Sequence, residues 1–451
     1  MDNMIIDCFA GGGGASVGIE MALGRPVDIA INHDPDAILM HKTNHPTTLH
    51  LTEDIFKVDL QKYVKGRKVS LMWASPDCTS HSKAKGGQPR KKGLRILPWA
   101  VYKHAKAILP EVIIMENVEE IQQWGPLDEK GHPIPERKGE DYKKFIAAMK
   151  SLGYTFGCRE LIAADYGAPT TRKRWYAIFR RDGKEIRWPV QTHSKDGHEL
   201  EQWKQCGDYI DWSDLGQSIF DRKKPLAEAT QKRIANGIRK YIIDAESPYI
   251  VEDGRAMSFI IQYHGETKDG DSRGQLLTEP IKTIDTSNRY GLVSAFVTKY
   301  YKTGIGQGCD EPIHTTGHFG LVSAFLIKYY GSGTGQQVNE PLATITTKDR
   351  FGLVNVVLDI KGEKYIISDI FLRMLKPREL MLMQGFPEDY IIDRDYKWQS
   401  YPIAKQVARI GNSVVPIMAK KLVEANCPYL KVGERMPNMV IDDSQQQLRF
   451  A

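Results

Sequence analysis

Short apolar runs alternate with amphipathic stretches along roughly the first 180 residues of the chain. The predicted strands are residues 4–8, 27–32, 69–74, 112–115 and 175–179, and residues 15–23 are a predicted helix. This alternation is typical of an α/β fold in which a parallel sheet is covered by helices on both faces. Open sheets of this kind bind ligands at the carboxyl ends of their strands, so we expect the chemistry to gather there.

A different pattern occupies residues 181–364, where segments rich in Gly, Thr, Tyr and Asp alternate in polarity and an octapeptide repeats. The sequence RYGLVSAF at 289–296 recurs as HFGLVSAF at 318–325 and more loosely at 350–354. We interpret this as a repeated β unit. One interpretation is that the aromatic residues of this unit pack the core of their own sheet. The other is that its Lys and Tyr side chains and glycine-rich turns contact DNA phosphates, and the two are compatible. Residues 365–425 return to helix and loop, and 426–451 are predicted to be a mobile tail.

Composition narrows the class of protein only modestly. Hydrophobic residues make up 41% and charged residues 26% of 451 residues, which excludes a disordered chain and suggests two or three domains. A net charge of +6 favours polyanionic partners without requiring them. No run of about 18 apolar residues occurs, so we expect a soluble, cytoplasmic protein with no membrane-spanning segment. The scattered cysteines lack metal-ligand spacing, and we expect free thiols and no metal site: Cys8, Cys78, Cys158, Cys206, Cys309 and Cys427.

A glycine-rich turn follows the first predicted strand. Asp7-Cys8-Phe9-Ala10 leads into four glycines, 11–14, immediately before the first predicted helix, a place where a helix N-terminus accepts an anion or carboxylate. The second strand ends in Asn32-His33, about twenty residues later, where a ribose-binding residue is expected. Asp54 then stands where it could reach an adenine amino group. This spacing fits a nucleoside cofactor, although a dinucleotide enzyme, a plain tight turn and a surface Asp remain alternatives.

The next strand runs into Ser75-Pro76-Asp77-Cys78, followed by a basic stretch that contains glycines and no acidic residue. Fixed positive charge and backbone N–H groups stabilise a thiolate, so Cys78 is a candidate nucleophile. The basic stretch has the composition of a mobile loop able to close over phosphates. The alternative is a buried structural cysteine beside a solvated charge run. The candidate DNA-binding residues are Lys83, Lys85, Arg90, Lys91 and Lys92.

A carboxylate and two arginines complete the candidate chemistry. Glu116, followed by Asn117, ends the strand next to that of Cys78. A thiolate adds to C6 of cytosine only if N3 is protonated or strongly hydrogen-bonded, and a carboxylic acid meets that need. Glu116 could instead be a metal ligand or a helix cap. Arg172 and Arg174 flank Lys173, and side chains two apart on an extended segment share a face, so the pair could hold a base carbonyl and a phosphate.

Taken in order, these segments resemble the DNA cytosine-5 methyltransferase family over residues 4–425. The matching segments are DCFAGGGG, Asp54-Ile55, the cysteine loop, MENV, TTRKR, RMLKPRELMLMQGFPEDY and QVARIGNSVVP. The resemblance implies an S-adenosylmethionine-dependent methyltransferase fold, a Rossmann-like mixed sheet with helices on both faces, plus an inserted and mostly β target-recognition domain. On this basis we expect catalytic segments at 1–180 and 365–425, the recognition domain at 181–364 and the tail at 426–451.

The resemblance also implies roles for individual residues. Cys78 would be the nucleophile, Glu116 the acid at N3, and Arg172 and Arg174 the pair that holds the flipped cytosine. Phe9 would stack on adenine and Asp54 would contact its amino group. The other positions implied in cofactor binding are Asp7, Ala10, Gly11, Gly13, Gly14, Asn32, His33, Ile55, Pro76, Asn412 and Ser413, with Gln406, Gly411 and Val414 beside them, while Arg378 and Gln384 support the recognition domain.

Three departures from the family pattern stand out. Asp77 lies between Pro76 and Cys78, which implies a one-residue bulge and a carboxylate that opposes thiolate formation. Asn32 replaces an acid at the ribose position, which leaves that role open to Asp34. Thr170 replaces Gln in the arginine segment. No reactive group is missing, so we expect activity.

The predicted function is therefore methyl transfer from S-adenosylmethionine to C5 of a flipped cytosine in a specific duplex sequence. The alternatives are an RNA (tRNA) cytosine-5 methyltransferase and a catalytically inactive DNA-binding relative, whereas a nicotinamide dehydrogenase explains only the glycine turn. We expect double-stranded DNA as partner, a monomer, and a bacterial or phage-encoded protein associated with the nucleoid. The target sequence, and whether a cognate restriction endonuclease exists, cannot be read from the chain.

Overall fold

The computed structural model describes most of the chain. The described residues are 3–77, 95–220, 222–251, 256–263, 273–299, 325–328, 336–337, 351–353, 357–360 and 363–432. They fall into two compact units. Unit 1 comprises Met1–Cys206, Pro280–Ser287 and Pro377–Ala451, and unit 2 comprises Gly207–Glu279 and Asn288–Lys376.

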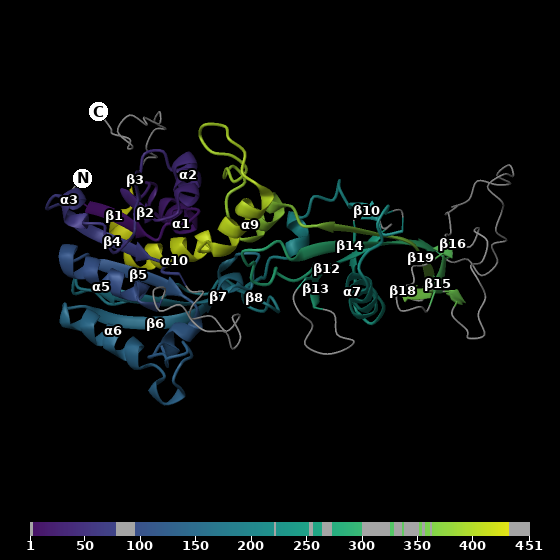
Figure 1. Ribbon diagram of the computed structural model, residues 1–451, viewed down its shortest axis with the longest axis horizontal. Helices are drawn as coiled ribbons and strands as arrows, with labels where there is room; N and C mark the ends of the chain where they lie inside the picture. Colours follow the sequence, from purple (N-terminus) through teal and green to yellow (C-terminus); the bar gives the residue numbers. More distant parts are fainter. Residues whose placement is uncertain are drawn as a thin grey trace. The chain divides into compact units, whose positions relative to one another are not determined.

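Unit 1 is built on a seven-stranded sheet with the strand order β3-β2-β1-β4-β5-β7-β6 (Figure 1). Neighbouring strands from β3 across to β5 pair in parallel, whereas β7 runs antiparallel to both β5 and β6. The carboxyl ends of six strands and the amino end of β7 therefore share one edge. The strands are β1 (Asn3–Cys8), β2 (Ile29–Asn32), β3 (Leu49–Thr52), β4 (Lys68–Ala74), β5 (Val112–Asn117), β6 (Thr155–Ile162) and β7 (Lys173–Arg180).

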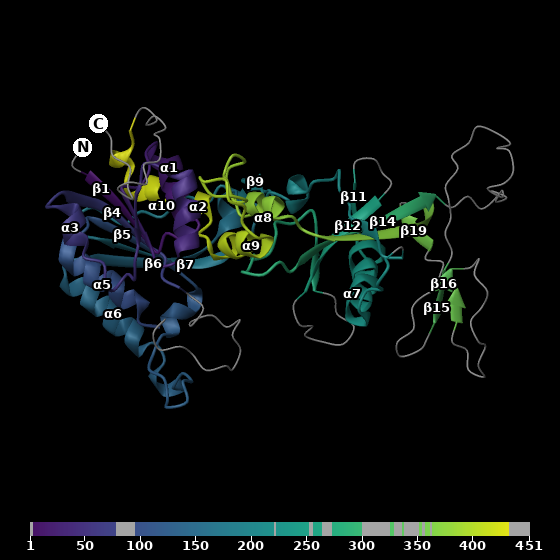
Figure 2. The ribbon, with the colours of Figure 1, turned by 45° about the horizontal axis from the view of Figure 1, so that its top comes forward.

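Helices cover both faces of this sheet (Figure 2). Side chains of a strand alternate between its faces: Ile6 and Met72 pack with α3, α5 and α6, whereas Ile5 and Leu71 pack with α1 and α10. Because both faces are buried, these strands read as nearly continuous apolar runs. The helices of unit 1 are α1 (Gly14–Leu23), α2 (Pro35–Asn44), α3 (Leu60–Val64), α5 (Leu97–Ile108), α6 (Glu140–Ser151), α8 (Pro377–Met383), α9 (Ile403–Asn412) and α10 (Pro416–Asn426).

The predicted mixed α/β sheet is confirmed, with differences in detail. All five predicted strands and the helix 15–23 are present within a few residues of the predicted bounds. Strands β3 and β6 were not predicted from the sequence. The alternating pattern alone suggested parallel pairing throughout, which is wrong for β6 and β7. β6 is half exposed and carries polar residues, so it lacks the apolar run of a central strand.

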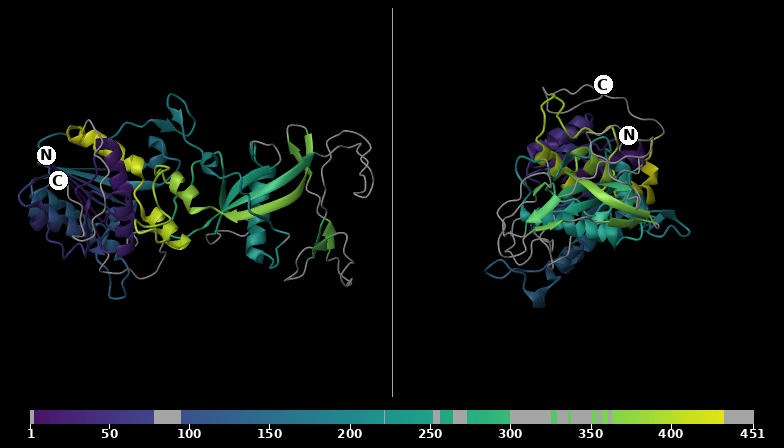
Figure 3. Two further views of the ribbon diagram at one scale, coloured as in Figure 1. Left: turned by 90° about the horizontal axis from the view of Figure 1, so that it is seen from above. Right: turned by 90° about the vertical axis from the view of Figure 1, so that its right-hand side faces the viewer.

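Unit 2 contains a sheet with the order β10-β19-β14-β12-β11, to which β13 and β18 add at β12 and β19. Its long strands β14 and β19 pair antiparallel, seen in teal and light green in Figure 3. Helix α7 (Glu228–Ile238) packs on this sheet. A separate three-stranded sheet has the order β16-β15-β17. The strands are β10 (Gln217–Ser218), β11 (Tyr249–Ile250), β12 (Ala256–Gln262), β13 (Gly274–Leu276), β14 (Tyr290–Lys299), β15 (Phe325–Lys328), β16 (Gln336–Gln337), β17 (Phe351–Leu353), β18 (Val357–Ile360) and β19 (Glu363–Met374).

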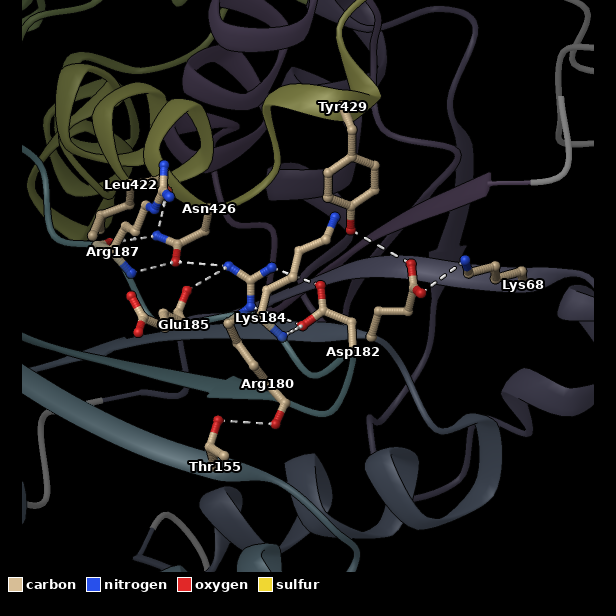
Figure 4. Close-up of polar contacts among 11 residues, drawn as sticks. Lys68, Thr155, Arg180, Asp182, Lys184, Glu185, Arg187, Leu422, Asn426 and Tyr429 are labelled. Atoms are coloured by element: carbon tan, nitrogen blue, oxygen red, sulfur yellow. Dashed lines mark hydrogen bonds and ion pairs between the residues drawn. The ribbon is translucent and has the colours of Figure 1, made fainter.

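Unit 1 extends past the predicted break at 181, because residues 181–206 bond back to it, and it resumes at Pro377 instead of residue 365. Figure 4 shows the Arg180 guanidinium between Asp182 and Asn426 of α10, at 2.6 Å from the Asp182 carboxylate. The Asn426 amide also donates to the carbonyl of Arg187 at 2.8 Å. Trp203 donates its indole N–H to Asp165. The assignment of unit 2 as the recognition domain stays a prediction.

The repeat and the C-terminal tail are only partly covered by the described residues. The first copy of the repeat forms part of β14, while most of the second copy lies outside the described residues. The predicted mobile tail falls outside them beyond residue 432. In the described part of the chain, no helix is both long and apolar enough to cross a membrane.

Candidate active site

The glycine turn between β1 and α1 adopts a conformation that requires glycine at two positions. Gly13 has φ 96° and caps the N-terminus of α1, and a Cβ there would lie 2.1 Å from the Tyr390 hydroxyl oxygen. A Cβ on Gly14 would lie 2.1 Å from the carbonyl oxygen of Val414. Phe9 itself has φ 67°, which is rare for a residue with a side chain. The turn is therefore held closely between the body of unit 1 and its C-terminal segment.

The C-terminal segment supplies the neighbours of this turn. Ser413 is buried, and a Cβ on Gly12 would lie 3.4 Å from its Oγ, whereas Asn412 is exposed. Gln384 donates its side-chain amide to the Ser413 carbonyl at 3.0 Å. A Cβ on Gly11 would meet only the Phe9 carbonyl within 4 Å, at 3.8 Å, so this side of the turn is open. The open side leaves room for a ligand against the backbone.

The ends of β2 and β3 present polar groups on the same edge of the sheet. Asn32 accepts the backbone N–H of Asp34 at 2.9 Å, and His33 is exposed. Asp54 is exposed and accepts the N–H of Phe56 at 2.9 Å, while Ile55 is buried. Since β1, β2 and β3 are neighbours, these groups and the glycine turn lie along one stretch of edge.

Glu116 and Arg174 form a buried ion pair beyond this stretch, where β5 and β7 meet. Arg174 Nε lies 3.2 Å from Glu116 Oε1, with the side chains 12% and 9% exposed respectively. The next residue, Asn117, donates its side-chain amide to the Pro76 carbonyl at 3.0 Å. This hydrogen bond joins the segment that leads into Cys78 to the strand that carries Glu116.

Arg172 contacts a different set of groups from Arg174. Its guanidinium donates to the carbonyls of Gly411, at 3.0 Å, and Ile284, at 3.3 Å. Thr170, the residue that replaces the expected Gln, accepts the Arg172 backbone N–H at 3.2 Å and is fully buried. Arg172 therefore links the arginine segment to the end of α9.

Several candidate residues lie outside the described part of the chain. These are the predicted nucleophile and the basic loop: Cys78, Lys83, Lys85, Arg90, Lys91 and Lys92. Asp77 is described and exposed, and β4 pairs with β1 and β5 without irregularity at Ala74. The bulge predicted at Asp77 stays a prediction.

The sequence profile of the C-5 cytosine-specific DNA methylase family matches residues 3–426, nearly the whole chain. The chain belongs to this family. Membership makes the protein a DNA cytosine-5 methyltransferase and implies the use of S-adenosylmethionine in general. This agrees with the resemblance found in the seven sequence segments.

Individual relatives are more distant. Type II methyltransferase M.AquIA of Picosynechococcus is 27% identical over 226 residues, which cover 47% of this chain and 88% of the relative. Type II methyltransferase M1.HphI of Haemophilus parahaemolyticus is 28% identical over 42% of this chain, and the matched part spans only about half of the relative, 49%. The solved structure of the Entamoeba histolytica methyltransferase EhMeth superposes with a TM-score of 0.47 at 15% identity, covering 95% of this chain and 97% of that one.

Two residues of this methylase that touch the glycine turn escaped the sequence analysis. Tyr390 donates its hydroxyl to the Gly12 carbonyl at 2.6 Å. The Cβ of Arg409, on α9, lies 3.4 Å from the position that a Cβ on Gly12 would take. Its guanidinium nitrogen Nη2 lies 3.6 Å from a carboxylate oxygen of Asp34 and 3.5 Å from one of Asp36. Both stand inside the family segments GFPEDY and QVARIGNSVVP, which was the available signal. Their side chains share no local pattern with the glycines, so nothing in the spacing linked them.

Proposed function

We propose that this protein methylates C5 of a cytosine extruded from duplex DNA, through a covalent bond between Cys78 and C6. The observation that carries the proposal is the shared edge of the sheet in unit 1. The open glycine turn, the Pro76–Asn117 link and the Glu116–Arg174 pair follow one another along it. A cofactor, a nucleophile and an acid are the three components that this reaction requires.

The proposed chemistry balances on the cytosine ring. The Cys78 thiolate forms a bond to C6 while Glu116 delivers a proton to N3, and C5 becomes nucleophilic. S-adenosylmethionine, when bound, supplies an electrophilic methyl group to C5. A base such as water then removes the C5 proton, the S–C6 bond breaks to release the Cys78 thiolate, and N3 returns its proton to Glu116, which restores the ring. Flipping the base costs a few kcal/mol of unpairing and unstacking.

Arginine side chains support this reaction from two positions. Glu116 is paired with Arg174 in the structure, so the proposal requires that Arg174 gives up this partner when the cytosine enters and turns to the base or its phosphate. Arg172 is already engaged with the carbonyls of Gly411 and Ile284. We propose that it holds the end of α9 beside the base.

The cofactor pocket proposed here uses the edge groups of β1, β2 and β3. The open side of Gly11 and the buried Ser413 Oγ, which has no hydrogen-bond partner among the described residues, fit a ligand lying against the turn. Asn32 and Asp54 stand at the neighbouring strand ends, where ribose and adenine would lie. The remaining predicted contacts are Phe9, Ala10, Gly13, Gly14, His33, Ile55, Pro76 and Asn412.

A trapping experiment tests the nucleophile. DNA that contains 5-fluorocytosine cannot lose its C5 substituent, so wild type with S-adenosylmethionine should form a stable adduct on a denaturing gel. Cys78→Ser should form none. Cys158→Ser, at a half-buried cysteine of β6, is the matched control and should trap like wild type. Equal trapping by wild type and Cys78→Ser would show that the proposed nucleophile is wrong.

Two alternatives are separated by substrate. Tritium transfer from labelled cofactor to DNA, but not to tRNA, is the expected result, and preference for tRNA would favour the RNA methyltransferase. No transfer to either would favour an inactive DNA-binding relative.

Bisulfite sequencing of DNA from cells that express the protein would give the target sequence, which we propose is read by unit 2. We also propose that it acts as a monomer on cellular DNA, with or without a cognate nuclease.

A further inference from the structure

A chain of four buried polar side chains lies behind the glycine turn, and the methylation reaction does not use it. Ser16, in the first turn of α1, donates its hydroxyl to Asp7 Oδ2 at 2.7 Å. His41 Nε2 lies 2.9 Å from Ser16 Oγ, and His41 Nδ1 lies 2.9 Å from His50 Nε2. The chain thus connects the end of β1, through α1 and α2, to β3.

The side chains of this hydrogen-bonded chain become slightly less buried toward His50. Asp7, Ser16 and His41 are fully buried, whereas His50 is 8% exposed. Asp7 Oδ1 is buried without a hydrogen-bond partner among the described residues, and His50 Nδ1 likewise has no well-aligned partner there. Both ends of the chain are therefore open to a proton. Of the four side chains only His50 has exposed surface, and its Nδ1 is itself buried, so exchange with solvent requires a small local opening at His50.

Few other charged or titratable groups face the chain from the elements packed against it. Within the described residues these are Cys8 on β1, Glu20 on α1, Lys42 and His45 on α2, and Tyr390. His45 pairs with Glu20 at 3.1 Å, and Tyr390 bonds to the Gly12 carbonyl. His45 and Lys42 are positively charged when protonated and oppose protonation of His50.

The hydrogen bonds of the chain can point in only two directions. With Asp7 ionised, His50 Nε2–H donates to His41 Nδ1, His41 Nε2–H donates to Ser16, and Ser16 donates to Asp7. With Asp7 protonated, every bond reverses, and His50 carries its proton on Nδ1, where the Thr48 backbone can accept it. The two arrangements differ by one proton, and both histidines are neutral in each.

The energetics favour placing that proton on the carboxyl group. Burial raises the pKa of Asp7 to about 7, although the Ser16 hydrogen bond opposes the rise. Burial lowers the pKa of His41 and lowers that of His50 to about 3. A proton that enters at His50 Nδ1 is therefore passed on: His50 gives its Nε2 proton to His41, His41 gives its own to Ser16, and Ser16 gives its own to Asp7.

We propose that this chain lets a carboxylate sealed beneath the glycine turn exchange its proton with solvent, and that the exchange makes binding of the cationic cofactor pH-dependent. The inference rests on the proposed function, since it assumes that S-adenosylmethionine lies against this turn. Ionised Asp7 attracts the sulfonium, and protonated Asp7 does not. The demethylated product, S-adenosylhomocysteine, lacks the sulfonium charge and should bind with little dependence on Asp7.

Calorimetric binding of both compounds to the full-length protein tests the coupling. One linked proton changes affinity by at most about tenfold per pH unit. We expect wild type to bind S-adenosylmethionine about tenfold more tightly at pH 8 than at pH 6, and S-adenosylhomocysteine less than threefold more tightly. Asp7→Asn should abolish the difference. Asp28→Asn, at the opposite end of β1, is the matched control and should retain it.

Nitrogen-15 NMR of histidine-labelled protein gives a readout that needs neither cofactor nor activity. We expect the His41 and His50 rings to stay neutral and to change from Nε2–H at pH 8.5 to Nδ1–H at pH 5.5. Exposed His33 should not show this exchange. Ser16→Ala interrupts the chain and should remove the linked change, which keeps the test available if Asp7→Asn fails to fold.

The outcomes separate the inference from the function on which it rests. Absence of S-adenosylmethionine binding at any pH contradicts the proposed function. Binding with a pH dependence that persists in Asp7→Asn contradicts the coupling alone. Tautomers that do not change with pH contradict the relay.

Discussion

Glu116 illustrates how a single residue acquires a role from its surroundings. It is the penultimate residue of β5, lies beside the segment that leads into Cys78, and is paired with Arg174 at 3.2 Å in a largely buried setting. Glu119, two residues beyond β5, is instead bonded to exposed Lys173 at 2.8 Å. Two carboxylates of the same type, three residues apart, thus have different partners and exposure. Of the two, Glu116 is the one that we propose meets a base at the sheet edge.

Replacing the Glu116 carboxyl group by an amide should affect the chemical step. Glu116→Gln keeps the size of the side chain but cannot give a proton to N3, so kcat should fall about 10²- to 10⁴-fold. Affinity for S-adenosylmethionine should stay within about threefold of wild type. Single-turnover methyl transfer with saturating DNA measures this. Glu119→Gln is the control, and a Glu116→Gln enzyme as fast as this control would remove Glu116 from the mechanism.

At the residue scale, one rule was enough to nominate candidate positions from the sequence, whereas contacts between distant residues could not be predicted. Strand ends flag Asn32 and Glu116 as candidates, because a buried strand is an apolar run and its polar exit is visible. The bond from Tyr390 to Gly12 joins residues 378 positions apart, and no periodicity connects them. The Asp7–Ser16–His41–His50 chain was missed for the same reason, since its members lie on four different elements.

At the scale of elements, the helix pair α1 and α10 depends on close backbone approach. A Cβ on Gly18 would lie 2.2 Å from the Pro416 carbonyl oxygen and 2.6 Å from Ala419 Cβ. Glycine normally weakens a helix, by about 1 kcal/mol relative to alanine. Here the packing of α10 outweighs that preference. The sequence predicted α1 correctly but not this contact, because Gly18 looks like an ordinary weak point in a helix.

Gly18→Ala should therefore destabilise the protein instead of stabilising it. The methyl group can be accommodated only if α10 moves away, and overpacking of this kind costs about 2 kcal/mol. Urea unfolding followed by circular dichroism measures the change. Met21→Ala, on the exposed side of the same helix, is the control and should change stability by less than about 0.5 kcal/mol. A Gly18→Ala protein as stable as wild type would contradict the close packing.

The connection from β7 to α10 depends on a buried ion pair. Arg180 and Asp182 are 2% and 6% exposed and lie 2.6 Å apart, and Arg180 also donates to Asn426 (Figure 4). Burial is the largest single effect and raises the pKa of Asp182, but the hydrogen bonds from Arg180 and the Lys184 backbone N–H, together with the charges of Arg180 and Lys184, outweigh it and lower the pKa of Asp182. The sequence showed a basic strand end here and gave no sign that residues 181–206 remain with unit 1. The buried pair is one reason why the unit boundary lies later than predicted.

Asp182→Ala should leave the Arg180 guanidinium buried without its counter-charge. Removing one partner of a buried pair costs about 3 kcal/mol. Guanidinium chloride unfolding measures this, with Glu185→Ala as the exposed neighbouring control. Methyl transfer per folded molecule should not change, since the pair lies at the end of β7 away from Glu116. A loss of activity without a loss of stability would contradict this purely structural role.

At the scale of the whole molecule, the buried chain behind the glycine turn links folding to pH in two opposite ways. Asp7 has a folded pKa of about 7 against an ordinary value of 3.8, so only the folded state keeps this proton between these values. Its contribution to stability is therefore lost as pH rises from about 4 to about 7. His41 and His50 have folded pKa values below the ordinary 6.5. The unfolded state binds their protons first, so stability is lost as pH falls below 6.5.

Asp7→Asn removes one of these opposing contributions and should change the pH profile of stability in a defined way. Asparagine cannot ionise, so the free energy of unfolding of the variant relative to wild type should rise between pH 4 and pH 7. The slope follows one proton, about 1.4 kcal/mol per pH unit, with a total rise of about 3 kcal/mol. Above about pH 8 the difference should be constant, because Asp7 is then ionised in both states of wild type. Urea unfolding at pH 5, 6, 7 and 8 measures the profile, with exposed Asp389→Asn as a control that should give a constant difference. A constant difference for Asp7→Asn as well would mean that the carboxyl group beneath the turn is ionised throughout, and the chain behind it would then carry no proton.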